Sequence, residues 1–391
     1  MLFRSVYVSS NRDRDRTAFA RVKTSGGQIE VIAGRDDADL GSSEISEDGK
    51  TAALVWNRDG RSELSFVDLG TGKVTGGPKL PAELVSGLAF SGDGRRLAFV
   101  ATGAAAPADI WVFDRPSGKM WQVTRSPHAG VDLSALVRPE LVKFRAHDGL
   151  ELSGWLYRPR GAQAAGPMVL SFHGGPEGQE TPSFSADYQA LVSRGISVFA
   201  PNVRGSSGFG KKFVNLDNGE LRFDGIKDIQ SCADFVVKSG WADAKRLGIM
   251  GGSYGGYMVT AAITEYPDLF AAAADLYGMV NFETFFAHTE PWMAAISTVE
   301  YGDPVTQADL LRRLSPIHKI DRIRTPTIVL HGANDTNVPV VEAEQVVENL
   351  KKRNVPVEYI LFPDEGHGWR KTSNRIRSTV AITQWFEARL K

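Results

Sequence analysis

The chain has 391 residues, of which 45 are Lys or Arg, 46 are Asp or Glu and one is Cys. This length exceeds one average domain of about 100–200 residues and therefore predicts two domains. The net charge of −1 lacks the basic excess of proteins that bind nucleic acids or anionic membranes, so we expect neither partner. A single cysteine, Cys232, can form neither an internal disulfide nor a Cys-rich zinc site, and we expect no metal ion and no other cofactor.

Membrane and export signals are not visible in the sequence. No apolar run approaches the ~20 residues of a membrane span. The N-terminal residues 1–7 lack the basic stretch and the apolar core of a secretory signal. These features predict a soluble, cytoplasmic protein.

Short apolar segments, separated by Gly, Asp and Ser turns, predict β-strands over roughly the first 125 residues. The predicted strands are Ser5–Val8, Ala52–Trp56, Leu64–Val67, Leu97–Val100 and Ile110–Phe113. This part of the chain therefore reads as an all-β domain.

A repeat of about 45 residues runs through this domain. The turn Ser46-Glu47-Asp48-Gly49-Lys50 returns as Ser91-Gly92-Asp93-Gly94-Arg95, and Gly72-Lys73 returns as Gly118-Lys119. Asp and Gly tolerate the positive φ of hairpin turns. About four strands in each ~45-residue unit is typical of β-propeller blades, and an evenly spaced β-sandwich is the alternative. We predict a partial β-propeller over residues 1–130.

From about Glu140 onward, nearly continuous apolar runs alternate with amphipathic stretches. The runs are typical of strands buried on both faces: Met168–Phe172, Ile196–Ala200, Leu247–Met250, Ala271–Leu276, Thr327–Leu330 and Val357–Phe362. The amphipathic stretches predict helices over Asp224–Lys238, Tyr257–Glu265, Val341–Lys352 and Ser373–Leu390. This alternation predicts a doubly wound, mostly parallel sheet in a second domain over residues 131–391.

A candidate nucleophile lies in the motif Gly251-Gly252-Ser253-Tyr254-Gly255, which follows an apolar strand and precedes a helical run. This is the G-x-S-x-G pattern of a nucleophile elbow in its expected strand–turn–helix context. Glycines are needed because the turn is strained and flanking side chains would collide with neighbouring strands. The motif predicts Ser253 as the nucleophile, and a Gly-rich turn with an incidental Ser is the alternative.

A Ser hydroxyl needs a base, and in elbow-containing enzymes the chain order is Ser, acid, His. Asp335 follows a predicted strand and would hold the imidazole in the right tautomer. His367 is the only His after Asp335 and lies in a loop before the last helix, which predicts it as the base. We expect Asp364 and Glu365 to cap or solvate that loop, and His331 to pack beneath the acid loop.

The oxyanion of a tetrahedral intermediate needs N–H donors that are already in place. One donor should be the backbone N–H of Tyr254, the residue after the nucleophile. The second should come from His173-Gly174-Gly175-Pro176, a loop close to the His-Gly-Gly-Gly type that follows a predicted strand. A simple turn is the alternative reading of this loop.

Together these motifs resemble the prolyl oligopeptidase family of serine peptidases, in which an α/β hydrolase is joined to a β-propeller. The branch that the chain resembles most is the acylaminoacyl-peptidase and dipeptidyl-peptidase-like one. The matching segments are His173–Pro176, Asn202–Gly210, Gly251–Tyr257, His331–Asp335 with Val338-Pro339, and Glu365–Gly368. The resemblance implies a triad of Ser253, Asp335 and His367, with backbone oxyanion donors at Gly175 and Tyr254.

The resemblance also implies a pocket for the residue before the scissile bond. Its lining would be Met279, Phe282, Phe285 and Val338, for which ordinary core packing is the alternative. Arg204 could bind a substrate carbonyl, although a structural salt bridge is the simpler interpretation.

The predicted propeller departs from the family pattern. Seven or eight blades of ~45 residues need over 300 residues, whereas the residues before the hydrolase suffice for about three. We therefore expect an incomplete propeller, in a chain that is either a fragment or a natural truncation. Open blade faces and strand edges predict self-association through the N-terminal strands, most simply as a two-fold dimer.

The leading functional interpretation is a serine hydrolase that cleaves peptide or acyl-amino-acid bonds of short substrates through an acyl-enzyme. A carboxylesterase that acts on small acyl esters is the alternative among enzymes, because the same triad cleaves esters. A non-catalytic interaction module built on the propeller strands is a further alternative. The presence of all three triad positions and both oxyanion loops disfavours it.

Overall fold

The computed structural model describes residues 5–162 and 164–391, and the chain divides into two compact units. Unit 1 comprises Met1–Arg138 with two later segments, Thr181–Ser185 and Ser207–Phe213. Unit 2 comprises Pro139–Glu180, Ala186–Ser206 and Val214–Lys391. Within the described residues, no helix is both long and apolar enough to cross a membrane.

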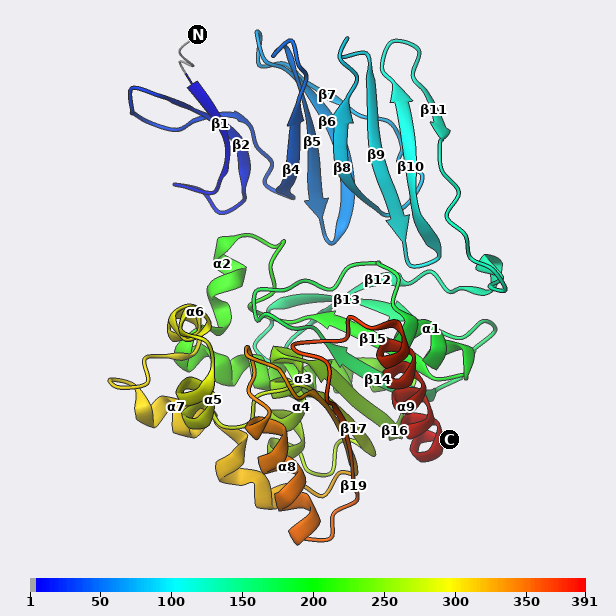
Figure 1. Cartoon of the computed structure of the whole chain (residues 1–391), viewed down its shortest axis with the longest axis vertical. Helices are drawn as coiled ribbons and strands as arrows, with labels where there is room; N and C mark the ends of the chain where they lie inside the picture. The colour runs from blue at the N-terminus through cyan, green and yellow to red at the C-terminus, as the bar shows by residue number, and fades with distance from the viewer. Residues whose placement is uncertain (1–4, 163) are drawn as a thin grey trace. The chain divides into compact units, whose positions relative to one another are not determined.

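From residue 5 onward, where the structure describes it, unit 1 contains three antiparallel sheets, each made of consecutive strands (Figure 1). The first sheet holds β1 (Ser5–Ser10), β2 (Ala18–Lys23) and β3 (Glu30–Ala33). The second holds β4 (Asp39–Ile45), β5 (Thr51–Arg58), β6 (Arg61–Asp68) and β7 (Val74–Gly76). The third holds β8 (Leu84–Phe90), β9 (Arg96–Gly103), β10 (Ala106–Asp114) and β11 (Lys119–Gln122), and the short helix η1 (Leu133–Ala135) follows. All five strands predicted in this part are confirmed.

The sequence repeat is also a repeat of hydrogen bonds. The Ser46 hydroxyl donates to the Asp48 carboxylate at 2.7 Å, and the Ser91 hydroxyl donates to the Asp93 carboxylate at 2.6 Å. Each hydroxyl also accepts the backbone N–H of the residue five positions later, at 3.0 Å in both turns. The glycine after each Asp has a positive φ, +67° in the first turn and +68° in the second. The second and third sheets are therefore equivalent units.

The second sheet is buried on both faces. On β5, Leu54 packs in an apolar cluster that contains Phe19 of the first sheet. The next residue, Val55, packs in a second cluster that contains Leu97 and Phe99 of the third sheet. Because successive residues of a strand point to opposite faces, the three sheets are stacked face to face.

Unit 2 is built on one eight-stranded mixed sheet with the order β12-β13-β15-β14-β16-β17-β18-β19. The strands are β12 (Glu140–Arg145), β13 (Glu151–Tyr157), β14 (Gly166–Phe172), β15 (Ser197–Asn202), β16 (Ala242–Gly252), β17 (Ala272–Leu276), β18 (Thr327–Gly332) and β19 (Val357–Phe362). The strands from β15 to β19 pair in parallel, whereas β13 is antiparallel to both β12 and β15. The six predicted strands are confirmed, and the antiparallel β12–β13 hairpin is an addition.

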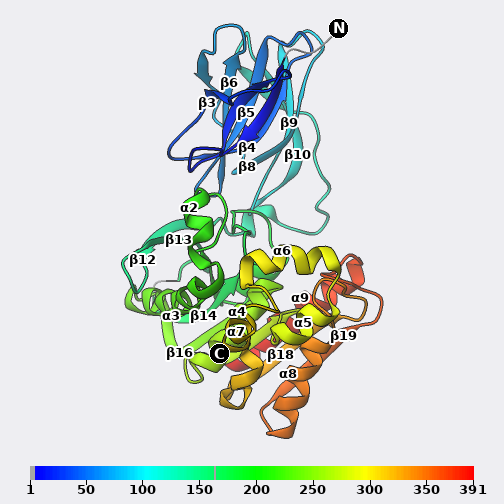
Figure 2. The same ribbon diagram turned by 90° about the vertical axis from the view of Figure 1, so that its left-hand side faces the viewer.

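Helices pack on both faces of this sheet (Figures 1 and 2). The helix α1 (Ala186–Ser193) contacts α9 (Thr372–Leu390), and α3 (Arg222–Lys238) contacts α4 (Tyr254–Glu265). The helix α8 (Val341–Lys352) packs on β18 and β19. Shorter helices complete the chain: α2 (Lys211–Val214), η2 (Asn215–Asp217), η3 (Gly219–Leu221), α5 (Phe282–His288), α6 (Pro291–Tyr301), α7 (Ala308–Leu314) and η4 (Pro316–Arg322). The four predicted helices are confirmed as α3, α4, α8 and α9.

Candidate active site

The predicted nucleophile lies in a strained turn between β16 and α4. Ser253 has φ +58° and ψ −121°, a conformation that residues with a side chain rarely adopt. A side chain at Gly255 would collide with the Phe172 carbonyl of β14, and one at Gly251 would collide with the Gly255 carbonyl. The tight turn between strand and helix therefore explains why this motif needs its glycines.

The three residues predicted as a triad come together at the carboxyl ends of the parallel strands. The Ser253 Oγ lies 2.9 Å from the His367 Nε2, and the His367 Nδ1 lies 2.8 Å from the Asp335 Oδ2. The other Asp335 oxygen accepts the N–H groups of Asn337 and Val338, both at 2.9 Å. With its proton on Nδ1, the His367 imidazole donates a hydrogen bond to the Asp335 carboxylate and accepts one from the Ser253 hydroxyl.

Other acids and histidines near this constellation have structural contacts, as predicted. The Asp364 carboxylate pairs with Lys371 at 2.5 Å. Glu365 accepts the Lys371 N–H at 2.9 Å, at the start of α9. His331 is fully buried, its Nε2 lies 2.9 Å from the Val338 carbonyl, and burial lowers its pKa. These contacts leave Asp335 as the carboxylate that holds His367.

Two backbone segments predicted to supply oxyanion donors lie beside Ser253. Tyr254 is the first residue of α4, so its N–H has no acceptor within the helix. A Cβ placed on Gly174 would lie 3.3 Å from the Ser253 Cβ, which shows how closely the His173–Gly178 loop passes. The His173 ring fixes that loop, because it contacts the Gly174 carbonyl at 2.7 Å and the Ser206 hydroxyl at 2.9 Å.

A cavity of about 740 Å³ adjoins Ser253. Three of the four predicted pocket residues, Met279, Phe285 and Val338, line it. The fourth, Phe282, is not among the residues that line this cavity. Phe282 is 1% exposed in the first turn of α5, and its ring packs against Tyr301 with 4.7 Å between centroids.

The helix α6 forms a wall of this cavity that the sequence did not reveal. Its lining residues are Met293, Ile296, Ser297, Val299, Glu300 and Tyr301, joined by Glu177 from the loop after β14. The apolar members recur at helical spacing after Pro291, which is the signal that could have identified this helix. Ile296 and Val299 are 55% and 73% exposed, so the wall is an open one.

The side chain of Tyr254 contacts a buried ion pair between Arg222 and Asp217. The Arg222 Nη1 donates to the Asp217 carboxylate at 2.7 Å, and both side chains are at most 1% exposed. The Tyr254 hydroxyl donates to the same carboxylate at 3.1 Å, while the Arg222 guanidinium lies 5.0 Å from the Tyr254 ring centroid. Tyr254 is thus fixed through its hydroxyl as well as by its place in α4.

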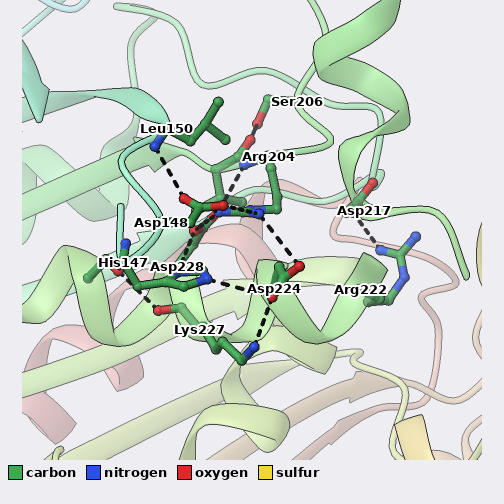
Figure 3. A network of polar contacts seen from close by, with 12 residues as sticks. His147, Asp148, Leu150, Arg204, Ser206, Asp217, Arg222, Asp224, Lys227 and Asp228 are labelled. Atoms are coloured by element: carbon green, nitrogen blue, oxygen red, sulfur yellow. Dashed lines mark hydrogen bonds and ion pairs between the residues drawn. The ribbon is translucent and has the colours of Figure 1, made fainter. Parts of the chain in front are cut away.

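Arg204 has a structural role, because its guanidinium is enclosed by carboxylates (Figure 3). It donates to both Asp228 oxygens at 2.8 and 2.9 Å and to both Asp148 oxygens at 3.1 Å. Arg204 is only 4% exposed. In the part of the chain that the structure describes, no group of three or more His, Cys, Asp or Glu is placed to hold a metal ion.

Known proteins have sequences or folds similar to those of this chain. Dipeptidyl aminopeptidase BIII of Pseudoxanthomonas mexicana is 30% identical over 98% of this chain and 58% of its own length. Acylamino-acid-releasing enzyme 1 of Oryza sativa subsp. japonica is 32% identical over 57% of this chain and 30% of its own length. A puromycin-hydrolyzing peptidase of Mycobacterium tuberculosis has the same fold, with a TM-score of 0.90 at 24% identity over 99% of this chain and 60% of that chain.

The chain spans less than two thirds of the length of each of these relatives. A profile of the prolyl oligopeptidase family matches residues 182–391, which is more than half of the chain. The matched part contains the hydrogen-bonded residues Ser253, His367 and Asp335. The family predicted from the sequence motifs is confirmed: the chain belongs to the prolyl oligopeptidase family.

Proposed function

We propose that this chain is a serine hydrolase that cleaves peptide or acyl-amino-acid bonds of short substrates through an acyl-enzyme. Ser253 is the nucleophile, His367 the general base and Asp335 the group that orients the imidazole. The observation that carries this proposal is the continuous hydrogen-bonded series from Ser253 to Asp335, with 2.9 and 2.8 Å between successive side chains. It meets the geometric requirement for activating a Ser hydroxyl.

The surroundings of Ser253 support an acyl-transfer reaction. Backbone N–H groups of Gly175 and Tyr254 would stabilise the oxyanion, and the neighbouring cavity is of the size that holds small ligands. The named peptidases among the relatives make peptides and acylated amino acids the first substrate classes to test.

Replacing the nucleophile tests the proposal. Ser253→Ala should lower the turnover number about 10⁴–10⁶-fold without unfolding the protein, since only the attacking atom is lost. Wild-type protein should also be labelled by a fluorophosphonate, and the variant should not. A variant that keeps more than a tenth of the wild-type rate would exclude Ser253. Comparing kcat/KM on acyl-peptide amides and on short p-nitrophenyl esters separates a peptidase from a carboxylesterase.

We further propose that the three sheets of unit 1 are blades of an incomplete β-propeller. Three observations support this: consecutive strands form each sheet, the sheets stack face to face, and the turn hydrogen bonds repeat between sheets.

A further inference from the structure

Part of the lining of the cavity beside Ser253 comes from two separate pieces of unit 2. Met279 and Phe285 belong to segment 279–285, which leads from β17 into α5, and Val338 lies in the loop between β18 and α8. The relative position of such lining residues decides how large a substrate side chain fits. A residue that ties the two pieces together can therefore influence which substrates are accepted.

Glu342, in the first turn of α8, makes this connection. One oxygen of its carboxylate accepts the backbone N–H groups of Val280 and Asn281, at 2.9 and 2.8 Å. The other oxygen accepts the Thr284 hydroxyl. Glu342 is fully buried and is not among the residues that line the cavity. Its effect on a substrate must therefore pass through segment 279–285.

The residues that Glu342 holds are direct neighbours of the cavity lining. Val280 follows Met279 in the chain, and Thr284 precedes Phe285. The Met279 carbonyl accepts the Thr260 hydroxyl of α4 at 3.2 Å, so Met279 is held on both of its sides. Because Val280 is also fully buried, water does not readily replace Glu342 as the acceptor of its N–H.

A second side chain of α8 binds the same segment. The Gln345 amide accepts the Asn281 Nδ2 at 2.9 Å and donates to the Thr284 Oγ1 at 2.9 Å. The first turn of α8 thus holds segment 279–285 through two side chains.

The Val338 side of the cavity is connected to Glu342 through the chain itself. The Glu342 N–H donates to the carbonyl of Pro339, the residue after Val338, at 3.0 Å. The Val338 N–H donates in turn to the Asp335 carboxylate at 2.9 Å. A shift of segment 279–285 away from Glu342 would therefore change its distance from Val338.

We propose that Glu342 is a specificity-determining residue, which positions segment 279–285 so that the cavity accepts a large apolar side chain of the substrate. Its three donors are two backbone N–H groups and a hydroxyl, all of them neutral. The role therefore needs a buried acceptor and not a negative charge. This inference rests on the proposed function, because the cavity is assigned to substrate through its place beside Ser253.

Two replacements of Glu342 separate the acceptor from the charge. Glu342→Gln keeps an oxygen for the two N–H groups, and its NH₂ group can donate to Thr284, whose hydroxyl proton then turns to the Asn281 carbonyl at 3.2 Å. Glu342→Leu has a similar size but no acceptor, so it leaves two buried N–H groups unpaired. We expect segment 279–285 to keep its position in the Gln variant and to shift in the Leu variant.

The N-acetyl-phenylalanyl and N-acetyl-glycyl p-nitrophenyl esters test this, because they share a leaving group and differ in the side chain. Wild-type kcat/KM should favour the phenylalanyl ester about ten- to hundredfold, the scale of burying an aromatic side chain. Glu342→Leu should reduce this preference about tenfold, mainly through a higher KM for the phenylalanyl ester, whereas Glu342→Gln should keep it within about twofold. For the glycyl ester, which lacks the side chain, the Leu variant should lose at most about threefold.

A milder variant covers the case in which Glu342→Leu does not fold. Gln345→Leu removes the second contact from a partly buried position and should reduce the same preference about threefold. A methyl NMR spectrum of the seven methionines gives a readout that needs no substrate. The Met279 signal, assigned with Met279→Leu, should move in Glu342→Leu and stay in place in Glu342→Gln.

Glu344→Leu is the matched control, because Glu344 is an exposed carboxylate in the same turn of α8. It should leave the rates for both esters at the wild-type level. Equal kcat/KM for the two esters in wild-type protein, equal losses on both in Glu342→Leu, or an equal loss of preference in Glu342→Gln and Glu342→Leu would overturn the proposal. Failure of the proposed function is a separate result: wild-type protein would neither hydrolyse the glycyl ester nor react with a fluorophosphonate.

Discussion

Asp335 is the residue whose replacement most directly tests how the imidazole is oriented. Its carboxylate is fully buried, accepts two backbone N–H groups and lies 2.8 Å from the His367 Nδ1. Asp335→Asn preserves the shape but favours the wrong imidazole tautomer, so we expect kcat to fall about 10⁴-fold while the fold stays intact. The rate of p-nitrophenyl ester hydrolysis measures the effect.

Asp364→Asn is the control for this variant. Asp364 lies close to His367 in the sequence, but its carboxylate pairs with Lys371 and Asn374. We expect its replacement to change kcat less than twofold. Comparable losses of kcat in the two variants would show that Asp335 does not orient His367.

Asp275 supplies a prediction about pH and stability. It is 1% exposed in β17 and accepts the Gly278 N–H at 3.0 Å. Burial raises the pKa of Asp275 from the ordinary 3.8 to about 7, and the nearby Glu342 carboxylate adds to the shift. Between about pH 4 and pH 7 the unfolded chain has released this proton while the folded chain still binds it. The free energy of unfolding therefore falls as pH rises through this window and levels off above it.

Asp275→Asn removes this titration and keeps an acceptor for the Gly278 N–H. The variant should therefore gain stability relative to wild type as pH rises from 4 to 7.5. Urea unfolding at several pH values measures the difference between the two proteins. If the free energies of unfolding of the two proteins change in parallel over that pH range, Asp275 does not hold its proton in the folded state.

At the scale of elements, Arg204 joins three segments of unit 2 through a partly buried network (Figure 3). It links the loop after β15 to Asp228 of α3 and to Asp148 in the β12–β13 turn. Arg204→Met leaves the Asp228 carboxylate buried without its cation, which costs about 3–5 kcal/mol of unfolding free energy. The loss should appear as a lower urea midpoint.

Two further variants test whether the loss of stability in Arg204→Met comes from the unpaired, buried Asp228 carboxylate. Lys238→Met breaks an exposed α3 pair with Asp234 and should cost less than about 1 kcal/mol. Adding Asp228→Leu to Arg204→Met should recover part of the loss, because the unpaired charge is then absent. Similar costs for the Arg204 and Lys238 variants would mean that the network contributes little.

Elements with a strong local pattern could be predicted from the sequence. The continuous apolar run at Val357–Phe362 corresponds to β19, and the amphipathic stretch Val341–Lys352 corresponds to α8. Ser253, Asp335 and His367 could be predicted as a group from motif context and chain order, because each lies shortly after a predicted strand.

Elements whose pattern depends on tertiary packing were missed. The edge strand β12 has only six residues, and its apolar Leu141 and Val142 are adjacent instead of alternating with polar residues, so its signal is weak. The helix α6 places Ile296 and Val299 toward an open cavity instead of a core. Glu177 and Glu300 line the same cavity only because the chain folds, and no local pattern links positions so far apart.

At the scale of the whole molecule, the third sheet of unit 1 presents an apolar row on the face away from the second sheet. On β10, Ile110 and Val112 stand opposite Val100 and Ala98 of β9, and Val112 also stands opposite Trp121 of β11. These residues alternate with those that pack toward the second sheet. Ile110 and Trp121 are each 41% exposed, so the row is open to solvent.

We expect this face to mediate self-association, most simply as a two-fold dimer. Contiguous apolar surface beyond a few hundred Å² normally marks an interface, and a net charge of −1 provides little repulsion between copies. Light scattering after size exclusion at tens of micromolar should therefore give about twice the mass of one chain. Replacing Ile110 by Lys and Trp121 by Ser puts charge and polarity into the row and should return the mass to that of one chain.

The position of these residues makes the test specific. Both side chains point away from the cluster between the second and third sheets, so their replacement removes little core packing and should leave the unfolding temperature nearly unchanged. Ser253 lies in the other compact unit, so activity per chain should also persist in the monomeric variant. A wild-type protein of single-chain mass at these concentrations would reject self-association. A variant that stays dimeric would assign the contact to another surface.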